Sequence, residues 1–138
     1  MLTENELADL SRKHNLSEEA FAIVRRIRQD LPSRIVRSGT HNTVTHYASR
    51  KMGCVIKAEA SRTELAAIYQ WDHDKTTHEF YDQPPAIKKI HIRENGKTYA
   101  HLYTPDFFRI ADDFVGWVEC KPEGWFVLIQ RFLHRLGC

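Results

Sequence analysis

The chain has 138 residues, a formal net charge of +2 and 42% hydrophobic residues. This length fits a single globular domain, because domains cluster around roughly 100–150 residues. No apolar run approaches the roughly 20 residues needed to cross a bilayer, and residues 1–15 lack the charged start and apolar centre of a secretory signal. We therefore expect a cytosolic protein without a membrane segment.

The three cysteines do not form a recognisable site. Cys54, Cys120 and Cys138 are an odd number and show no Cys-x-x-Cys spacing, so neither a zinc site nor a disulfide framework is indicated. We expect reduced thiols.

The charge is unevenly distributed. Residues 33–58 contain no acid and five cations, which are Arg34, Arg37, Arg50, Lys51 and Lys57. A patch of one sign attracts phosphate, since each neutralised backbone charge releases condensed counterions. The segment is therefore either a DNA-binding element or a solvated basic loop.

Two helices are predicted near the N-terminus. Thr3 and Glu6 fit a capping box, and Ser17 fits an N-cap followed by acidic residues. The second helix has apolar residues at helical spacing and is expected to end at Pro32.

The middle of the chain predicts less regular structure. Residues 33–53 lack a helical period and are interpreted as a long surface loop or a loop with a short strand. Residues 54–58 predict a short strand. Residues 61–72 predict a third helix, with Glu64 in its first turn.

A β-type pattern follows. Residues 87–93 alternate with a period of two and residues 98–103 return as their partner, through an Asn95-Gly96 step that favours a type I′ turn. Pro105 is expected to kink the chain. Further strands are predicted at residues 78–82, 107–110 and 114–121. The apolar residues 124–136 fit either a strand or a helix.

One strand end carries the chemically informative residues. Glu119 and Lys121 are two apart and project from one face of a strand, while Cys120 turns to the other face. If the strand after Asp106 pairs with this one, its carboxylate reaches the same place. Carboxylates that close repel, and each is driven towards protonation. A divalent cation removes the conflict.

Hard oxygen ligands of this kind suit Mg²⁺, with Mn²⁺ as a substitute. The backbone carbonyl of Cys120 could supply a further oxygen. Such an ion acidifies bound water and stabilises charge at phosphorus. Lys121 would orient or help to deprotonate that water, or steady the developing negative charge.

These residues carry a family resemblance. Pro105-Asp106 followed by Glu119-Cys120-Lys121 matches the PD-(D/E)xK signature of restriction-endonuclease-like nucleases. The wider set resembles the N-terminal catalytic domain of TnsA-type transposon endonucleases over roughly residues 50–122. It comprises Lys51-Met-Gly53, Ser61-Arg-Thr-Glu64-Leu, Gln83-Pro84, Thr104-Pro-Asp-Phe107 and Glu119-Cys-Lys-Pro122.

The resemblance implies a mixed α/β (α+β) fold with a restriction-endonuclease-like core. This core would be a central mixed sheet with a meander, flanked by helices. The implied domain spans residues 33–138 and follows a helical extension at residues 1–32. Family members continue with a helix and a strand that complete the core, followed by a further domain. The resemblance therefore implies that the C-terminal part of the core could be incomplete here.

The resemblance also implies roles for individual residues. Asp106 would be the central metal ligand, Glu64 a further metal-binding carboxylate, and Lys121 the catalytic lysine. Some family members have an amide where this chain has Glu119, and a carboxylate there restores the general nuclease pattern. The substrate would be double-stranded DNA at transposon ends, and the partner a DDE-type transposase.

Each residue also has a purely structural interpretation. Ser61 and Glu64 fit a capping box, which would leave Glu59 as the alternative acid. Asp106 fits a turn, and Glu119 with Lys121 fits a surface ion pair. Gln83 fits a packed amide as an alternative to a DNA contact. Cys120 fits a small core residue.

The functional hypothesis is a Mg²⁺-dependent DNA endonuclease. Two alternatives stay open from the sequence. One is a catalytically silent DNA-binding or assembly module of a transposase complex. The other is a restriction or repair nuclease of the same PD-(D/E)xK type.

Overall fold

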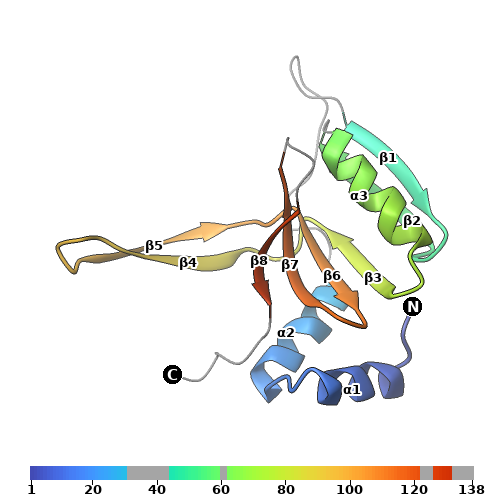
Figure 1. Ribbon diagram of the computed structural model, residues 1–138, viewed down its shortest axis with the longest axis horizontal. Coiled ribbons are helices and arrows are strands. Elements are labelled where there is room, and N and C mark those ends of the chain that lie inside the picture. Colours follow the sequence, from blue (N-terminus) through green and yellow to red (C-terminus); the bar gives the residue numbers. More distant parts are fainter. Residues whose placement is uncertain (31–43, 60–61, 122–125, 132–138) are drawn as a thin grey trace.

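The structure is a computed structural model that describes residues 1–30, 44–59, 62–121 and 126–131. These residues form three helices and eight strands in a mixed α+β arrangement (Figure 1). In chain order the elements are α1 (Glu4–Lys13), α2 (Glu18–Gln29), β1 (Val44–Ser49), β2 (Cys54–Glu59), α3 (Arg62–His73), β3 (Thr77–Asp82), β4 (Ile87–Ile92), β5 (Thr98–Tyr103), β6 (Phe107–Ala111), β7 (Val115–Cys120) and β8 (Phe126–Arg131).

The two N-terminal helices begin where the sequence predicts. Thr3 and Glu6 form the full capping box of α1, and the Ser17 side chain accepts the N–H of Ala20 at the start of α2. Helix α2 ends at Gln29, with Asp30 as an extended C-cap, so it ends earlier than the predicted end at Pro32, which itself lies outside the described residues.

The centre of the fold is a four-stranded sheet in the order β3-β6-β7-β8. Its described pairs are all antiparallel, as are the β1–β2 and β4–β5 pairs. The resemblance implies a mixed sheet, and no parallel pair occurs among the described strands. The predicted meander is present, since β6, β7 and β8 are consecutive neighbours. β8 also shows that residues 126–131 of the ambiguous apolar tail form a strand.

The sheet is covered on both faces, and alternation along β6 explains how. Phe107 packs with Ile68 and Trp71 of α3, whereas Phe108 packs with Val24 of α2 and with Trp117. The helices α1 and α2 therefore lie on one face, and α3 with β1 and β2 lies on the other (Figure 1). Helices α1 and α2 share an apolar core with the sheet.

A buried ion pair fastens the N-terminal helices to the sheet. Arg28 of α2 donates through Nε to Glu79 Oε1 at 2.9 Å, and the Glu79 side chain is fully buried. Arg28 also donates to the Leu2 carbonyl, and the Tyr81 hydroxyl donates to Glu79. Removing one partner would leave the other charge buried and unpaired, which is costly.

The basic segment contains more regular structure than a plain loop. Val44–Ser49 forms a strand that pairs with Cys54–Glu59. Of the two interpretations of residues 33–53, a loop with a short strand is therefore the one that fits. Gly53 completes the turn with φ +66°, a conformation that glycine adopts at little cost. Residues 31–43 lie outside the described residues.

The β4–β5 hairpin projects from the body of the protein (Figure 1). The predicted strands are confirmed, but the type I′ turn is wrong. Of the two central residues only Gly96 has positive φ, at +79°, and Gly96 N–H donates to the Arg93 carbonyl. A type I′ turn requires positive φ at both residues, so the connection is a longer loop in which Gly96 alone is left-handed.

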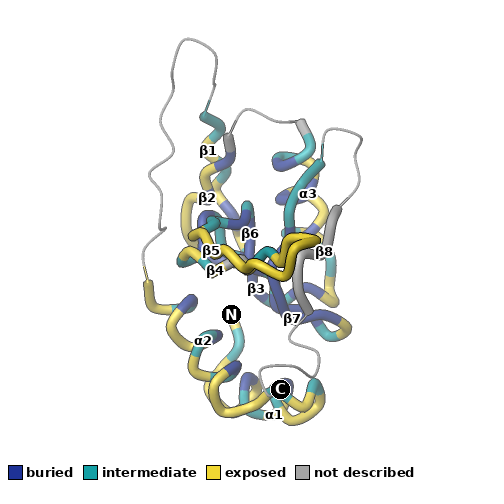
Figure 2. The backbone as a smooth tube through the Cα atoms, turned by 90° about the vertical axis from the view of Figure 1, so that its left-hand side faces the viewer, coloured by how far each residue is buried: buried dark blue, intermediate teal, exposed yellow. Residues whose placement is uncertain are grey.

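Seen along the hairpin, most of this element is exposed (Figure 2). Ile92 and Leu102 are both 76% exposed and Ile90 is 65% exposed.

No helix in the described part of the chain is both long and apolar enough to span a bilayer.

Candidate functional site

The candidate site lies where β6 begins and β7 ends. These two ends meet because β6 and β7 are antiparallel, with Phe107 opposite Val118. Asp106 immediately precedes β6, and its Oδ2 accepts the backbone N–H of Cys120 at 2.8 Å. The Asp106 carbonyl accepts the N–H of Gln83 at 3.0 Å. Asp106 is thus fixed by its main chain to the end of β3 and by its side chain to the end of β7.

Glu119 and Lys121 face one another at the end of β7. Lys121 Nζ lies 3.6 Å from Glu119 Oε2, and the two side chains are 45% and 25% exposed, respectively. The other oxygen, Glu119 Oε1, accepts a hydrogen bond from the Tyr103 hydroxyl. The two oxygens of Glu119 therefore face different residues, Tyr103 at the end of β5 and Lys121 just after β7.

Glu64 approaches from the third element, α3. It lies in the first turn of the helix, as predicted, and is only 8% exposed. Burial of a carboxylate is rare without compensating partners. The capping interpretation depends on Ser61, which lies outside the described residues, and nothing is described of the Glu59 side chain.

The thiol of Cys120 reports how these acids are arranged. Its pKa is raised to about 12, first by burial and then by the negative charges of Asp106, Glu64 and Glu119. Three carboxylates from separate parts of the chain therefore lie close enough to the end of β7 for their charges to act on this thiol. Cys120 packs against the apolar core that contains Phe107 and Val118, as expected of a small core residue.

The side chains are nevertheless engaged with protein groups. Among the described residues, no three or more His, Cys, Asp and Glu residues form a group that could hold a metal ion. Asp106 accepts the Cys120 N–H, and Glu119 faces Tyr103 and Lys121. The backbone carbonyl of Cys120, which is predicted as a further ligand, is a main-chain oxygen and does not count among these side chains.

The predicted DNA-binding cations have different positions. Arg50 and Lys57 are exposed at the β1–β2 hairpin. Arg34 and Arg37 lie outside the described residues. Lys51 is the exception, because its Nζ donates to the backbone carbonyls of Trp71, Asp74 and Thr77.

These contacts favour a structural role for Lys51 over the predicted DNA contact. Its ammonium binds carbonyls at the C-terminus of α3 and the start of β3, where the negative end of the helix dipole favours a cation. Burial lowers the pKa of Lys51. The residue ties a helix to a strand.

Gln83 has the features of a packed amide. It is 2% exposed and its backbone lies in the left-handed region, with φ +48°. Positive φ is uncommon for residues other than glycine. Its burial favours the structural interpretation over direct contact with DNA in this conformation.

Sequence reasoning missed Tyr103. Its hydroxyl holds Glu119 although the two residues are 16 positions apart and belong to strands of different sheets. Local spacing contains no signal for such a contact. The only available hint was the position of Tyr103, three residues before Asp106 and at the foot of a predicted hairpin.

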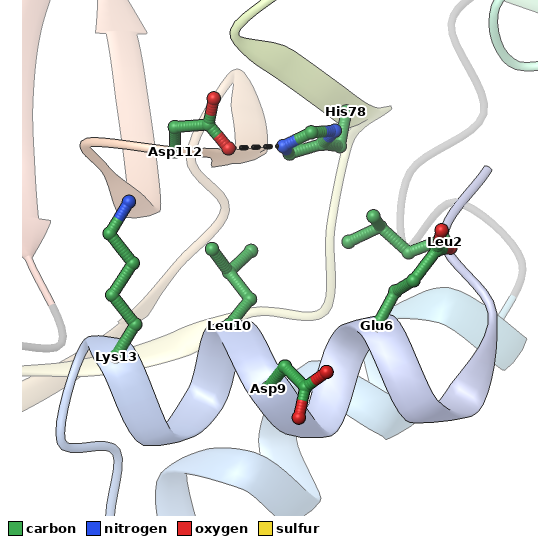
Figure 3. Close-up of a pocket in the computed structure, with 7 residues that line it drawn as sticks. All are labelled: Leu2, Glu6, Asp9, Leu10, Lys13, His78 and Asp112. Atoms are coloured by element: carbon green, nitrogen blue, oxygen red, sulfur yellow. Dashed lines mark hydrogen bonds and ion pairs between the residues drawn. The ribbon is translucent and has the colours of Figure 1, made fainter.

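A separate pocket lies between α1 and the other end of β6 (Figure 3). His78 Nε2 lies 2.5 Å from Asp112 Oδ1, and this hydrogen bond lowers the pKa of Asp112. Asp112 follows β6, whereas Asp106 precedes it. The pocket is lined by Leu2, Glu6, Asp9, Leu10, Lys13, His78 and Asp112.

Comparison with models of known protein families and with curated proteins gives no match to this chain.

Proposed function

We propose that this chain is a Mg²⁺-dependent endonuclease that hydrolyses phosphodiester bonds of double-stranded DNA at transposon ends. The observation that carries the proposal is that the charges of Glu64, Asp106 and Glu119 all act on Cys120 at the end of β7, where Lys121 faces Glu119 and the Cys120 N–H donates to Asp106. The proposal extends the resemblance of the PD-(D/E)xK residues to TnsA-type nucleases.

The charge of this cluster fits a hard divalent cation. Burial and then the negative charge of three carboxylates raise the pKa of one thiol, and the carboxylate oxygens are the ligand type that Mg²⁺ prefers. Glu64, Asp106, Glu119 and the carbonyl of Cys120 would hold the ion. When bound, Mg²⁺ would lower the pKa of a water molecule and stabilise negative charge at the phosphorus.

The protein groups then have distinct tasks. Lys121 is the partly exposed cation of the cluster and would stabilise negative charge on the phosphate or orient the attacking water. The Tyr103 hydroxyl holds one oxygen of Glu119, and the Cys120 N–H holds one oxygen of Asp106. These bonds orient the carboxylates before DNA arrives.

DNA would approach over exposed cations. Arg50 and Lys57 lie on the β1–β2 hairpin, which packs on the same face of the sheet as α3. In this proposal a DDE-type transposase cuts the other strand at the same transposon end.

Nicking of supercoiled plasmid tests the proposal. Wild type should nick with Mg²⁺ or Mn²⁺ and stop with EDTA, and Asp106→Asn and Lys121→Ala should each slow nicking by at least about 100-fold. Asparagine keeps an oxygen for the Cys120 N–H, so this variant should still fold. Asp113→Ala is the matched control, because Asp113 is an exposed carboxylate at the other end of β6. Nicking that survives both site variants would remove the proposed site.

The second candidate is a silent DNA-binding or assembly module. It is favoured by the engagement of Asp106 and Glu119 with protein groups, and by the lack of a ready metal-binding group in the described residues. Calorimetric titration separates the two candidates. Heat of Mn²⁺ binding that is lost in Asp106→Asn supports the nuclease. No heat, together with DNA binding that is insensitive to EDTA, supports the silent module.

A further inference from the structure

The β4–β5 hairpin has two chemically different faces. Residues directly opposite in an antiparallel pair share a face, so the register places Ile90 with Ala100 on one side and His91 with Tyr99 on the other. The first face also carries Ile92 and Leu102, with Thr98 and Lys88 opposite them, and its large apolar side chains are exposed. The second carries aromatic rings and cations.

The aromatic face is ordered by stacking. The His91 ring stacks on Tyr99 with centroids 4.8 Å apart and on His101 at 4.9 Å. The Arg93 guanidinium lies over the Tyr99 ring, 5.0 Å from its centroid. These contacts hold a row of rings in place with a cation near the tip, which suits a partner with negative charge.

The charge of the hairpin selects a polyanion. Residues 87–103 contain one acid, Glu94, and four cations, which gives a net charge of +3 with neutral histidines. The cations are Lys88, Lys89, Arg93 and Lys97. A positive element of this kind gains binding free energy from a phosphate backbone by releasing counterions.

The aromatic face leads to the carboxylate cluster. Tyr103 pairs with Ile87 at the foot of the hairpin and, by alternation, shares the face of His101 and Tyr99. Its hydroxyl donates to Glu119. The hairpin also begins and ends at the site, since Gln83 N–H bonds the Asp106 carbonyl across its base.

We propose that the β4–β5 hairpin is a DNA-binding arm whose aromatic and cationic face, Arg93, Tyr99, His91 and His101, seats duplex DNA beside the carboxylate cluster. This inference deepens the proposed function and rests on it for the position of the cut. A two-stranded ribbon fits the major groove, which is about 12 Å wide. Strands of six residues extend roughly 20 Å, or about six base-pair steps of ~3.4 Å.

DNA binding in EDTA tests the arm without requiring cleavage. Fluorescence anisotropy would measure the affinity for a labelled duplex of about two helical turns and for the corresponding single strand, over a series of salt concentrations. The variant Arg93→Ala/Lys97→Ala should lower the slope of log K against log salt by about 1.8 and weaken duplex binding by roughly tenfold or more. Tyr99→Ala should weaken duplex binding by about two- to fivefold, because the ring no longer holds the Arg93 guanidinium through a cation–π contact.

Two controls match these changes. Ile92→Thr alters the opposite face of the same hairpin and keeps a β-branched residue, so duplex affinity should stay within about twofold. Arg12→Ala/Lys13→Ala removes the same charge from exposed positions in the last turn of α1 and should leave most of the salt slope intact. Thermal melting of every variant checks that the fold is retained.

The outcomes are distinct. Unchanged slope and affinity in Arg93→Ala/Lys97→Ala overturn the inference, as does a preference for single strands. Loss of binding in Ile92→Thr alone also overturns it and points to a protein partner on the apolar face. If Asp106→Asn still nicks plasmid while the hairpin variants lose duplex binding, the proposed catalytic site fails and the DNA-binding arm stands. If Asp106→Asn loses nicking and the hairpin variants bind normally, the reverse holds.

Discussion

The β6–β7 pair and the β4–β5 pair are both antiparallel hairpins, but β6 (FFRIA) is almost wholly apolar, whereas β4 (IKKIHI) mixes apolar and polar residues. Phe107 and Phe108 of β6 are both fully buried, whereas Ile92 and Leu102 of the projecting hairpin are 76% exposed. The same antiparallel pairing therefore gives a core strand in one place and an exposed arm in the other. Alternation specifies a strand with two chemically different faces, but it does not specify what covers them.

The difference comes from the layers on each side. Consecutive residues of β6 point to opposite faces, and each face meets helices. Both faces of β6 are thus removed from water, which is the main source of stability in a small domain. In the described residues only the foot of the β4–β5 pair joins a core, through Ile87.

The largest expected effect is in the buried pair. Phe108→Ala removes a ring that packs edge-on against Trp117, with centroids 5.5 Å apart, and that contacts the α2 side of the core. We expect a loss of about 3–5 kcal/mol in the free energy of unfolding, measured by urea denaturation. A loss below about 1 kcal/mol would show that α1 and α2 do not cover this face.

An intermediate effect is expected at the polar junction of α3 and β3. The backbone N–H of Thr76 is the main cause that lowers the pKa of Asp74 from 3.8 to about 2, helped by the Thr76 and Thr77 hydroxyls and by Arg109. A depressed carboxylate pKa stabilises the fold above the unfolded value, and this contribution is lost as pH falls from about 4 towards 2.

Asp74→Asn should therefore cost roughly 1–2 kcal/mol at neutral pH, less than the full shift because the carboxylate is partly solvated. Denaturation at several pH values measures this. The difference between the variant and wild type should shrink below pH ~4 as the wild-type carboxylate protonates. A difference that does not change with pH would mean that the charge of Asp74 does not contribute.

The smallest expected effect is in the arm. Leu102→Thr replaces an exposed apolar side chain with a polar one that favours strands, so the free energy of unfolding should change by less than about 0.5 kcal/mol. Thermal melting measures it. A loss comparable to that of Phe108→Ala would mean that the apolar face of the hairpin is covered in solution.

The local features of the fold were largely predictable from the sequence. The capping box at Thr3 and the N-cap at Ser17 are short-range signals, and both are confirmed. The strands around Asn95-Gly96 are confirmed too, but the turn type is wrong because backbone dihedrals depend on the whole loop. The packing of α1 and α2 on the sheet could not be read from their amphipathic pattern, which shows an apolar face without naming its partner.

The candidate site was predictable in part for the same reason. Alternation correctly separated Glu119 and Lys121 from Cys120, and Lys121 does face Glu119. The contacts of Tyr103 with Glu119 and of Lys51 with three carbonyls depend on tertiary pairing, so no local pattern indicated them. Lys51 also shows that a cation in a basic segment can be used by the fold itself.

The hydrogen bond from Gln83 to Asp106 sets a rule for changing the hairpin. This bond joins the two ends of the segment that leaves the sheet after β3, forms the β4–β5 hairpin and returns at β6. The ladder between β3 and β6 begins at the next pair, Asp82 with Phe107. Residues could therefore be inserted beyond this bond without disturbing the sheet. Adding two residues to each strand would lengthen the reach and keep Tyr103 and Tyr99 on one face, whereas adding one to each would turn the outer rings to the opposite side.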